Sequence, residues 1–461
     1  MTMRTLALAI QVLLFATAGF AQQPASPVAG SWEGAIEAGI VKLRIGVTVT
    51  VQPDGTLRAS MDSPDQGAYG LVLDDVTFAD GVLKFALKRA GGTFEGRLNA
   101  AGTEVTGTWT QGAVLPLVLK KVEKLSRPNR PQEPKPPLPY RSEQVPIVNA
   151  IGRAVLDGTL TVPEGKGPHP AVVLITGSGA QNRDEEIFGH KTFLVLADHL
   201  TRHGIAVLRY DDRGVGKSTG SFAAATSEDF AGDAWAAWQT LSTRPGIDAK
   251  RVGLLGHSEG GLIAPMVAAS HPEIAFVVML AGPGVTGEQV MLQQAAAITK
   301  ASGASDDAIA ASTALQQQVF AILREEKTTT RIVERLSAIP GLGSKEAVDA
   351  AVKQWSSPWF RFFATYDPAP ALTKVRCPVL AIAGELDLQV VSTQNLPAIG
   401  AALKQGGNQD HTVLELPGLN HLLQPAKTGS PAEYAQIEVT IAPAALDTIT
   451  TWIQKRTGLA K

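Results

Sequence analysis

The segment Val252–Ile263 constrains the fold of this chain more than any other stretch. Its apolar start, Val252–Leu255, predicts a short buried strand that runs directly into a G-x-S-x-G pattern, Gly256-His257-Ser258-Glu259-Gly260. In this pattern a strand reverses sharply into a helix, and glycines flank the serine because side chains there would clash. We therefore predict that Ser258 is a catalytic nucleophile, the alternative being a purely structural turn.

Length and composition place the chain among globular proteins of more than one domain. It has 461 residues, with 41 Lys and Arg against 43 Asp and Glu, and a net charge of -2. This balance gives no basic footprint for nucleic acid. The single cysteine, Cys377, excludes an intramolecular disulfide.

Residues 1–21 predict a signal peptide. Arg4 is followed by an apolar stretch, Leu6–Ala18, too short to span a bilayer comfortably, and by small residues suited to cleavage. We expect export to the periplasm or the extracellular space, with no stable membrane span after cleavage. An uncleaved membrane anchor is the alternative.

Residues 28–125 predict an all-β domain, a small barrel or sandwich, because alternating segments are separated by regular turn signals. Gly30-Ser31-Trp32 near its start has a partial echo in Gly107-Thr108-Trp109 near its end. We expect the first and last strands to lie side by side, with Trp32 and Trp109 inside; a ligand-binding barrel is the alternative interpretation. The proline-rich residues 126–140 predict a semi-rigid linker rather than a ligand for a proline-recognition module.

Residues 141–283 and 371–461 predict an α/β core, because continuous apolar runs such as Ala171–Thr176 alternate with helical segments. Residues 284–370 interrupt this order with helices alone, which predicts a cap over the active site. Its aromatic residues are expected to line the underside of the cap or to pack it down; they are Trp355, Trp359, Phe360, Phe362 and Phe363.

A nucleophilic serine needs a base and an orienting acid, which follow the serine in the order acid, then histidine. Asp387 comes directly after the predicted strand Val379–Ala383, and Glu385 is the alternative acid. His421 follows the last predicted strand, and His411 is expected to precede that strand. The oxyanion hole requires two backbone N–H groups, which we assign to Glu259 and to Ser178.

These motifs carry a resemblance that covers about residues 145–461. The segments are Thr176-Gly177-Ser178-Gly179, Gln181-Asn182-Arg183-Asp184-Glu185, Asp211-Asp212-Arg213-Gly214, Gly256–Gly261, Gly384–Asp387 and Gly418–His421. Together they resemble the bacterial α/β-hydrolase carboxylesterases related to acylaminoacyl peptidases and dienelactone hydrolases. The resemblance implies a mostly parallel central sheet flanked by helices, ester hydrolysis through an acyl-enzyme, no cofactor and, in several members, an extra N-terminal β domain. Thr176 departs from the histidine of many relatives.

Two other motifs indicate less. Gly214-Val215-Gly216-Lys217-Ser218 resembles the end of a P-loop, but Asp211 occupies the position of the required first glycine. In the hydrolase interpretation Arg213 forms a structural ion pair instead. His199 and His203 are four residues apart, without the glutamate of a zinc-protease motif or a third ligand, so we expect no metal.

These features predict an exported serine hydrolase that cleaves small carboxylic esters with short or medium apolar acyl groups. The alternatives are a peptidase or amidase, a thioesterase or lactonase, and a non-catalytic binding protein built on the same fold. The sequence leaves the oligomeric state open.

Overall fold

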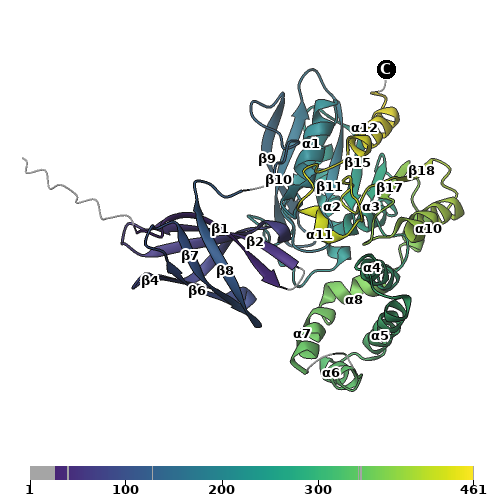
Figure 1. Cartoon of the computed structure of the whole chain (residues 1–461). Helices are drawn as coiled ribbons and strands as arrows, with labels where there is room; N and C mark the ends of the chain where they lie inside the picture. The colour runs from purple at the N-terminus through teal and green to yellow at the C-terminus, as the bar shows by residue number, and fades with distance from the viewer. Residues whose placement is uncertain (1–25, 39–40, 127, 341, 343–344, 460–461) are drawn as a thin grey trace, which may run out of the picture. The chain divides into compact units, whose positions relative to one another are not determined.

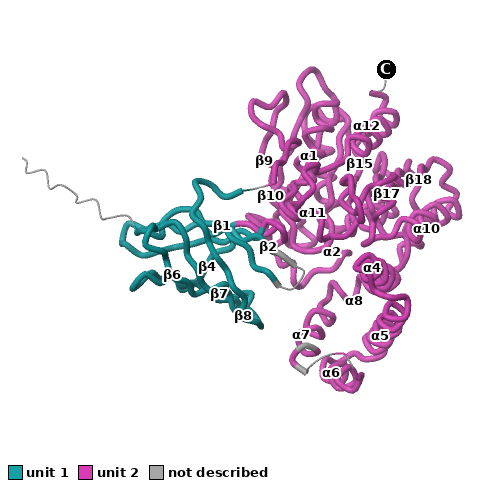
Figure 2. Tube along the Cα trace, in the orientation of Figure 1, with its two compact units in different colours: residues 1–63, 70–126 teal, residues 64–69, 127–461 magenta. Residues whose placement is uncertain are grey.

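The computed structural model describes residues 26–38, 41–126, 128–340, 342 and 345–459. The predicted signal peptide lies outside these residues. The contacts of the chain divide it into two compact units, one of residues 1–63 and 70–126, the other of residues 64–69 and 127–461 (Figure 2).

The first unit is built on a closed antiparallel barrel whose strands follow one another in sequence order. β1 pairs with both β2 and β8, so the first and last strands lie side by side as predicted. Trp32 and Trp109 are buried inside, where Phe85 stacks on Phe94 at 4.8 Å between ring centroids. Side chains therefore fill this barrel, as expected for eight strands. The strands are β1 (Gly30–Ala38), β2 (Val41–Val51), β3 (Leu57–Ser63), β4 (Ala68–Ala79), β5 (Val82–Leu87), β6 (Gly92–Leu98), β7 (Glu104–Gln111) and β8 (Ala113–Val122).

The second unit contains an eight-stranded sheet of order β18-β17-β16-β15-β11-β14-β10-β9 (Figure 1). β9 and β10 run antiparallel at one edge of the sheet. The other strands, β14, β11, β15, β16, β17 and β18 in sheet order, are parallel to one another. The strands are β9 (Tyr140–Asn149), β10 (Ala154–Pro163), β11 (His169–Ile175), β14 (Ala206–Tyr210), β15 (Ile247–His257), β16 (Val277–Leu280), β17 (Val379–Gly384) and β18 (His411–Leu416). His411 is thus the first residue of the last strand and does not precede it. Parallel strands bring their carboxyl ends, and the loops that follow them, to one edge of the sheet.

Helices cover both faces of this sheet. Val172 and Leu174 of β11 pack with α1 (Thr192–Arg202) and α12 (Pro443–Thr457). Val173 and Ile175 point the opposite way, into the core shared with α2 (Ser227–Ser242), α3 (Glu259–Ala268) and α10 (Ser392–Gln405). A strand buried on both faces explains the continuous apolar runs of the sequence. These layers confirm the predicted α/β-hydrolase fold.

The cap consists of helices α4 to α8, which gather in one group in Figure 1. Their bounds are α4 (Gly287–Ala301), α5 (Asp306–Glu325), α6 (Thr329–Ser337), α7 (Lys345–Trp355) and α8 (Pro358–Thr365). Polar caps begin several of them: Ser357 Oγ accepts a hydrogen bond from the Phe360 amide at 3.2 Å, with Pro358 at the first helical position. Helices α5, α6 and α7, the distal helices of the cap, share a hydrophobic core of their own. Its buried residues are Val319, Ile322, Ile332, Leu336, Val348 and Val352. Among the helices of the described residues, none combines the length and apolarity that a membrane crossing requires.

The β14–α2 connection holds the motif that resembles the end of a P-loop. Ser218 Oγ donates to the Asp211 carbonyl at 2.8 Å, and Arg213 Nε lies 2.7 Å from Asp233 Oδ2. The predicted ion pair of Arg213 is therefore confirmed, and the loop is braced by its own side chains.

Asp212 of the same connection is a buried carboxylate behind the turn that follows β11. Its Oδ1 accepts from Thr176 Oγ1 at 2.9 Å and its Oδ2 from the Gln181 amide at 2.8 Å. Burial raises the pKa of Asp212 to about 7, although these hydrogen bonds oppose the shift. Neutrality at this position therefore favours the folded state.

Asp212→Asn should raise the free energy of unfolding at alkaline pH. Because the folded chain retains a proton that the unfolded chain releases, stability falls as pH rises from about 4 to 7, by at most about 1.4 kcal/mol per pH unit. The asparagine stays neutral, accepts from the Gln181 amide and donates to Thr176. Urea unfolding between pH 5 and 8 should show an excess stability that grows up to about pH 7 and then levels off. The exposed Asp307→Asn is the control, and an excess independent of pH would contradict the prediction.

Candidate active site

Ser258 lies at the sharp turn between β15 and α3, with φ 53° and ψ −117°. A Cβ atom on Gly256 would come within 1.9 Å of the Gly260 carbonyl oxygen, and one on Gly260 within 2.1 Å of the Ile175 oxygen. These approaches are possible only for glycine, which explains both glycines of the motif. The Ser258 amide donates to the Leu280 carbonyl at 2.8 Å, so β16 also supports the strained turn.

The structure brings Asp387 and His421 together at the ends of β17 and β18. His421 Nδ1 lies 2.8 Å from Asp387 Oδ2, and both side chains are buried. Asp387 Oδ1 accepts from the amides of Gln389 and Val390 at 2.8 and 2.9 Å. These three contacts fix the orientation of the carboxylate toward the ring, and the other ring nitrogen of His421 is the one left for a further partner.

Glu385, the alternative acid, is exposed and accepts a hydrogen bond from the Gly418 amide at 2.9 Å. It therefore braces the loop that carries His421, while Asp387 contacts the ring itself.

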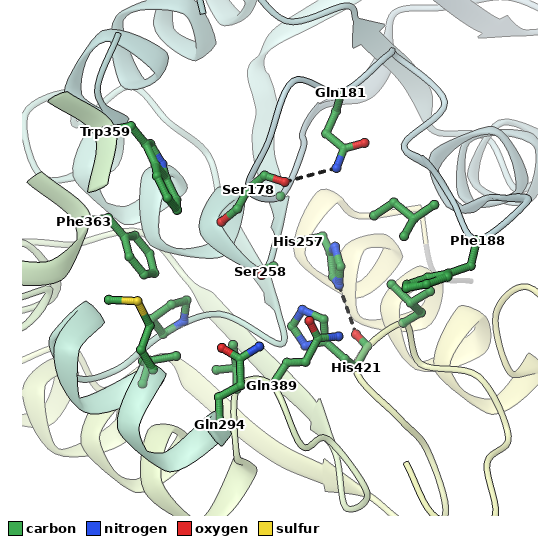
Figure 3. Close-up of a pocket in the computed structure, with 17 residues that line it drawn as sticks. Ser178, Gln181, Phe188, His257, Ser258, Gln294, Trp359, Phe363, Gln389 and His421 are labelled. Atoms are coloured by element: carbon green, nitrogen blue, oxygen red, sulfur yellow. Dashed lines mark hydrogen bonds between the residues drawn. The ribbon is translucent and has the colours of Figure 1, made fainter. Parts of the chain in front are cut away.

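A cavity of about 330 Å³ opens over the turn, with Ser258 and His421 both in its wall (Figure 3). Within the described residues Ser258 Oγ makes no hydrogen bond to the His421 ring; such bonds are often long before substrate binds. The core supplies further lining residues, among them Ser178, Gln181, Phe188, Gln389 and Leu422. The cap supplies Val290, Met291, Gln294, Trp359 and Phe363. Of the five cap aromatics singled out in the sequence, only these last two reach the cavity, and Phe360 packs inside the cap.

The two backbone amides assigned to the oxyanion hole in the sequence, those of Ser178 and Glu259, both lack a hydrogen-bond partner among the described residues. Glu259 is the first residue of α3, so its N–H has no partner inside the helix. Ser178 lines the cavity, and among the described residues its amide makes no hydrogen bond. The neighbouring Gly177 amide is already used, because it donates to Glu185 Oε1 at 2.8 Å. The Ser178 amide, unlike that of Gly177, is therefore available to a ligand in the cavity.

The side chain of Glu259 has a role that the sequence did not indicate. It is buried and accepts from Ser227 Oγ at 2.6 Å and from Trp359 Nε1 of the cap at 2.8 Å, and the Ser178 hydroxyl also bonds to it. Burial raises its pKa, and the three donors oppose that shift. The side chain of Glu259 therefore links α3 to the cap and to the turn that contains Ser178.

Glu185 and His257 were quoted as parts of motifs, but no function was assigned to either. They form a buried pair beneath the site, with Glu185 Oε1 at 2.9 Å from His257 Nδ1. Burial alone would lower the pKa of His257, but attraction to Glu185 and the hydrogen bond to it outweigh burial and raise the pKa. Both residues stood in quoted motifs, Glu185 at the end of Q-N-R-D-E and His257 directly before Ser258. Nothing in the sequence indicated that they contact each other.

The rings of His199 in α1 and of His203, which follows the last residue of α1, are tilted by 30° with centroids 4.3 Å apart. Across the described part of the chain, no group of three or more His, Cys, Asp or Glu side chains is arranged to hold a metal ion.

Comparison with known proteins gives relatives for the second unit. The esterase EstD of Thermotoga maritima is 29% identical over 303 residues, which cover 65% of this chain and 66% of EstD, just under two thirds of either protein. An esterase of Pyrococcus furiosus, Pf2001, is 16% identical with a TM-score of 0.44, covering 72% of this chain and 98% of that chain. A dienelactone hydrolase from Anabaena variabilis is also 16% identical, with a TM-score of 0.38 and coverage of 70% and 98%.

A family model described as serine aminopeptidase, S33, matches residues 190–424. The match includes the turn at Ser258, the cap, Asp387 and His421. Because it spans 235 of the 461 residues, more than half, the chain belongs to the serine aminopeptidase S33 family of hydrolases.

Proposed function

We propose that this protein is a serine esterase in which Ser258, His421 and Asp387 form the catalytic triad. The observation that carries the proposal is the 2.8 Å contact of His421 Nδ1 with Asp387, in the wall of the cavity that contains the strained Ser258. The similarity to EstD supports an ester as substrate.

In the proposed reaction His421 takes the proton of the Ser258 hydroxyl as the oxygen attacks the ester carbonyl. Asp387 fixes the tautomer of the ring and stabilises the imidazolium that forms. The amides of Ser178 and Glu259 donate hydrogen bonds to the negatively charged carbonyl oxygen. Each such donor stabilises the transition state by about 3 kcal/mol. His421 then protonates the leaving alcohol and activates water for deacylation.

The cavity favours small acyl groups. Its cap side is mainly apolar, since Gln294 is the one amide beside Val290, Met291, Trp359 and Phe363 in the described lining. Its volume of about 330 Å³ lies at the lower end for ligand pockets. On the core side, Gln181 and Gln389 are neutral hydrogen-bonding groups suited to the polar part of an ester. We therefore propose short or medium apolar acyl esters as substrates. A thioester or a lactone would react by the same steps.

The family description raises a second candidate, cleavage of an amino-terminal residue from a peptide. An aminopeptidase must bind the substrate's free ammonium group, which a buried carboxylate does best. Among the described residues that line the cavity, none is Asp or Glu. Glu259 lies nearby, but three donors already occupy its side chain. The lining therefore supports the ester over the peptide.

We also propose that the protein acts after export. The apolar stretch Leu6–Ala18 behind Arg4 supports a cleaved signal peptide.

Ser258→Ala should lower hydrolysis of p-nitrophenyl butyrate by at least about 1,000-fold, because no other group can form the acyl-enzyme. It should also abolish labelling by a fluorophosphonate. The control is Ser270→Ala, the same change on an exposed serine just beyond α3. Turnover that survives in Ser258→Ala would exclude this serine as the nucleophile.

Asp387→Asn should lower kcat by about 1,000-fold or more, because an amide can donate to Nδ1 and so hold the wrong ring tautomer. Glu385→Gln, in the same loop, should retain activity within about threefold. Steady-state kinetics on one ester would compare the two. A larger loss in Glu385→Gln would assign the acid to that residue.

A substrate panel should separate esterase from aminopeptidase activity. We expect p-nitrophenyl acetate and butyrate to exceed the palmitate ester by at least about tenfold in kcat/KM, because a long chain does not fit the cavity. An aminoacyl p-nitroanilide should show no turnover. Preference for the palmitate ester would contradict the proposed selectivity for short acyl groups. Cleavage of the anilide would favour the peptidase activity.

A further inference from the structure

The buried pair of Glu185 and His257 contacts each of the segments that the proposed mechanism uses. Glu185 is 0% exposed and His257 is 2% exposed. Glu185 Oε1 accepts from the Gly177 amide at 2.8 Å and lies 2.9 Å from His257 Nδ1. His257 Nε2 lies 3.0 Å from the carbonyl oxygen of His421, a contact drawn in Figure 3. The pair thus joins the oxyanion turn, the nucleophile strand and the loop of the base.

The partners of this pair fix its protons. A carbonyl oxygen can only accept, so Nε2 of His257 must carry a hydrogen. The Gly177 amide can only donate, so Oε1 of Glu185 accepts there. One further proton then occupies the contact between Nδ1 and Oε1. An imidazolium beside a carboxylate satisfies all three hydrogen bonds, and the pair as a whole is neutral, which makes its burial tolerable.

His257 is therefore unable to serve as the general base, although it precedes Ser258 in the sequence. One ring nitrogen is occupied by Glu185 and the other by the His421 carbonyl. The two rings lie 4.8 Å apart between centroids, and only His421 has a ring nitrogen free for Ser258. What His257 can do is hold the backbone from which the His421 ring extends.

We propose that Glu185 and His257 are positioning residues that act as one unit, fixing the His421 backbone and the oxyanion turn relative to Ser258. The inference rests on the proposed function, because it assigns His421 as the base. A displacement of about 1 Å in a catalytic group can cost on the order of 100-fold in rate, so such a unit would act on kcat. His257 is one residue of the cavity wall and the others stay in place, so substrate binding should change far less than kcat.

Two substitutions of His257 separate its two hydrogen bonds. His257→Asn places an amide nitrogen near the position of Nδ1, which keeps the contact with Glu185 and loses the one with the His421 carbonyl. His257→Gln reaches the position of Nε2 and keeps the contact with the His421 carbonyl. If His257 only filled space, there would be no reason for His257→Gln to be more active than His257→Asn.

The test measures kcat and KM for ethyl butyrate and p-nitrophenyl butyrate in both variants. We expect His257→Asn to lose about 10- to 100-fold in kcat, with KM within about twofold, and His257→Gln to recover at least about fivefold of that loss. The loss should be larger for the ethyl ester, because ethanol needs a proton from a correctly placed His421 whereas p-nitrophenolate leaves without one.

Glu185→Gln should lower kcat in the same way, with the exposed Glu186→Gln as the matched control. Combined with His257→Asn it should add little further loss, as expected for residues of one unit. Crystal structures of His257→Asn and His257→Gln give a readout without turnover: the His421 backbone should shift in the first and return in the second.

Equal losses in His257→Asn and His257→Gln, unchanged kcat, or an unmoved His421 backbone in His257→Asn would each overturn this inference while leaving the dependence on Ser258 intact. Failure of the proposed function would appear differently, as wild-type activity that survives in Ser258→Ala.

Discussion

Close contact between backbone segments at the Ser258 turn sets the geometry of the whole second unit. Gly260 lies against the Ile175 carbonyl at the end of β11, and Gly256 lies against Gly260 itself. α3 can therefore start directly beneath β11 and β15, at the same edge of the sheet as the turn that contains Ser178. The strained conformation of Ser258 is held by hydrogen bonds and packing from neighbouring strands, so this serine is positioned by rigid elements.

The other parts of the site come to this turn because parallel strands end at one edge of the sheet. Asp387 follows β17 and His421 follows β18. Backbone amides of these loops donate to carboxylates, Gln389 to Asp387 and Gly418 to Glu385. Buried polar side chains complete the arrangement: Glu259 links the site to the cap, and Glu185 with His257 links its three loops. His257 uses both ring nitrogens and Glu259 has three donors, as burial in a medium of low polarity demands, whereas Oε2 of Glu185 is buried without a partner among the described residues.

Local patterns in the sequence were enough to predict the fold and the location of the candidate triad. Apolar runs, the turn glycines around Ser258 and the order of acid and histidine depend on neighbouring residues, and the paired Trp32 and Trp109 motifs indicated how the barrel closes. The contact of Glu185 with His257 joins positions 72 residues apart, and that of Trp359 with Glu259 joins positions 100 apart. Both depend on how loops fold over the sheet edge. The sequence favoured Asp387 over Glu385 of the same loop, and the coordinates add that Asp387 contacts His421 whereas Glu385 contacts the Gly418 amide.

The cap has two layers, each with its own cluster of buried hydrophobic residues, and Leu323 and Trp355 pack against both clusters. The distal layer packs α5, α6 and α7 around Ile332 and Val352, whereas Trp359 and Phe363 on α8 reach the cavity. Side chains of the distal cluster can therefore be exchanged, or its loops lengthened, without changing the atoms that a substrate meets. The residues of the cavity wall and those of the distal cluster can therefore change in evolution at different rates.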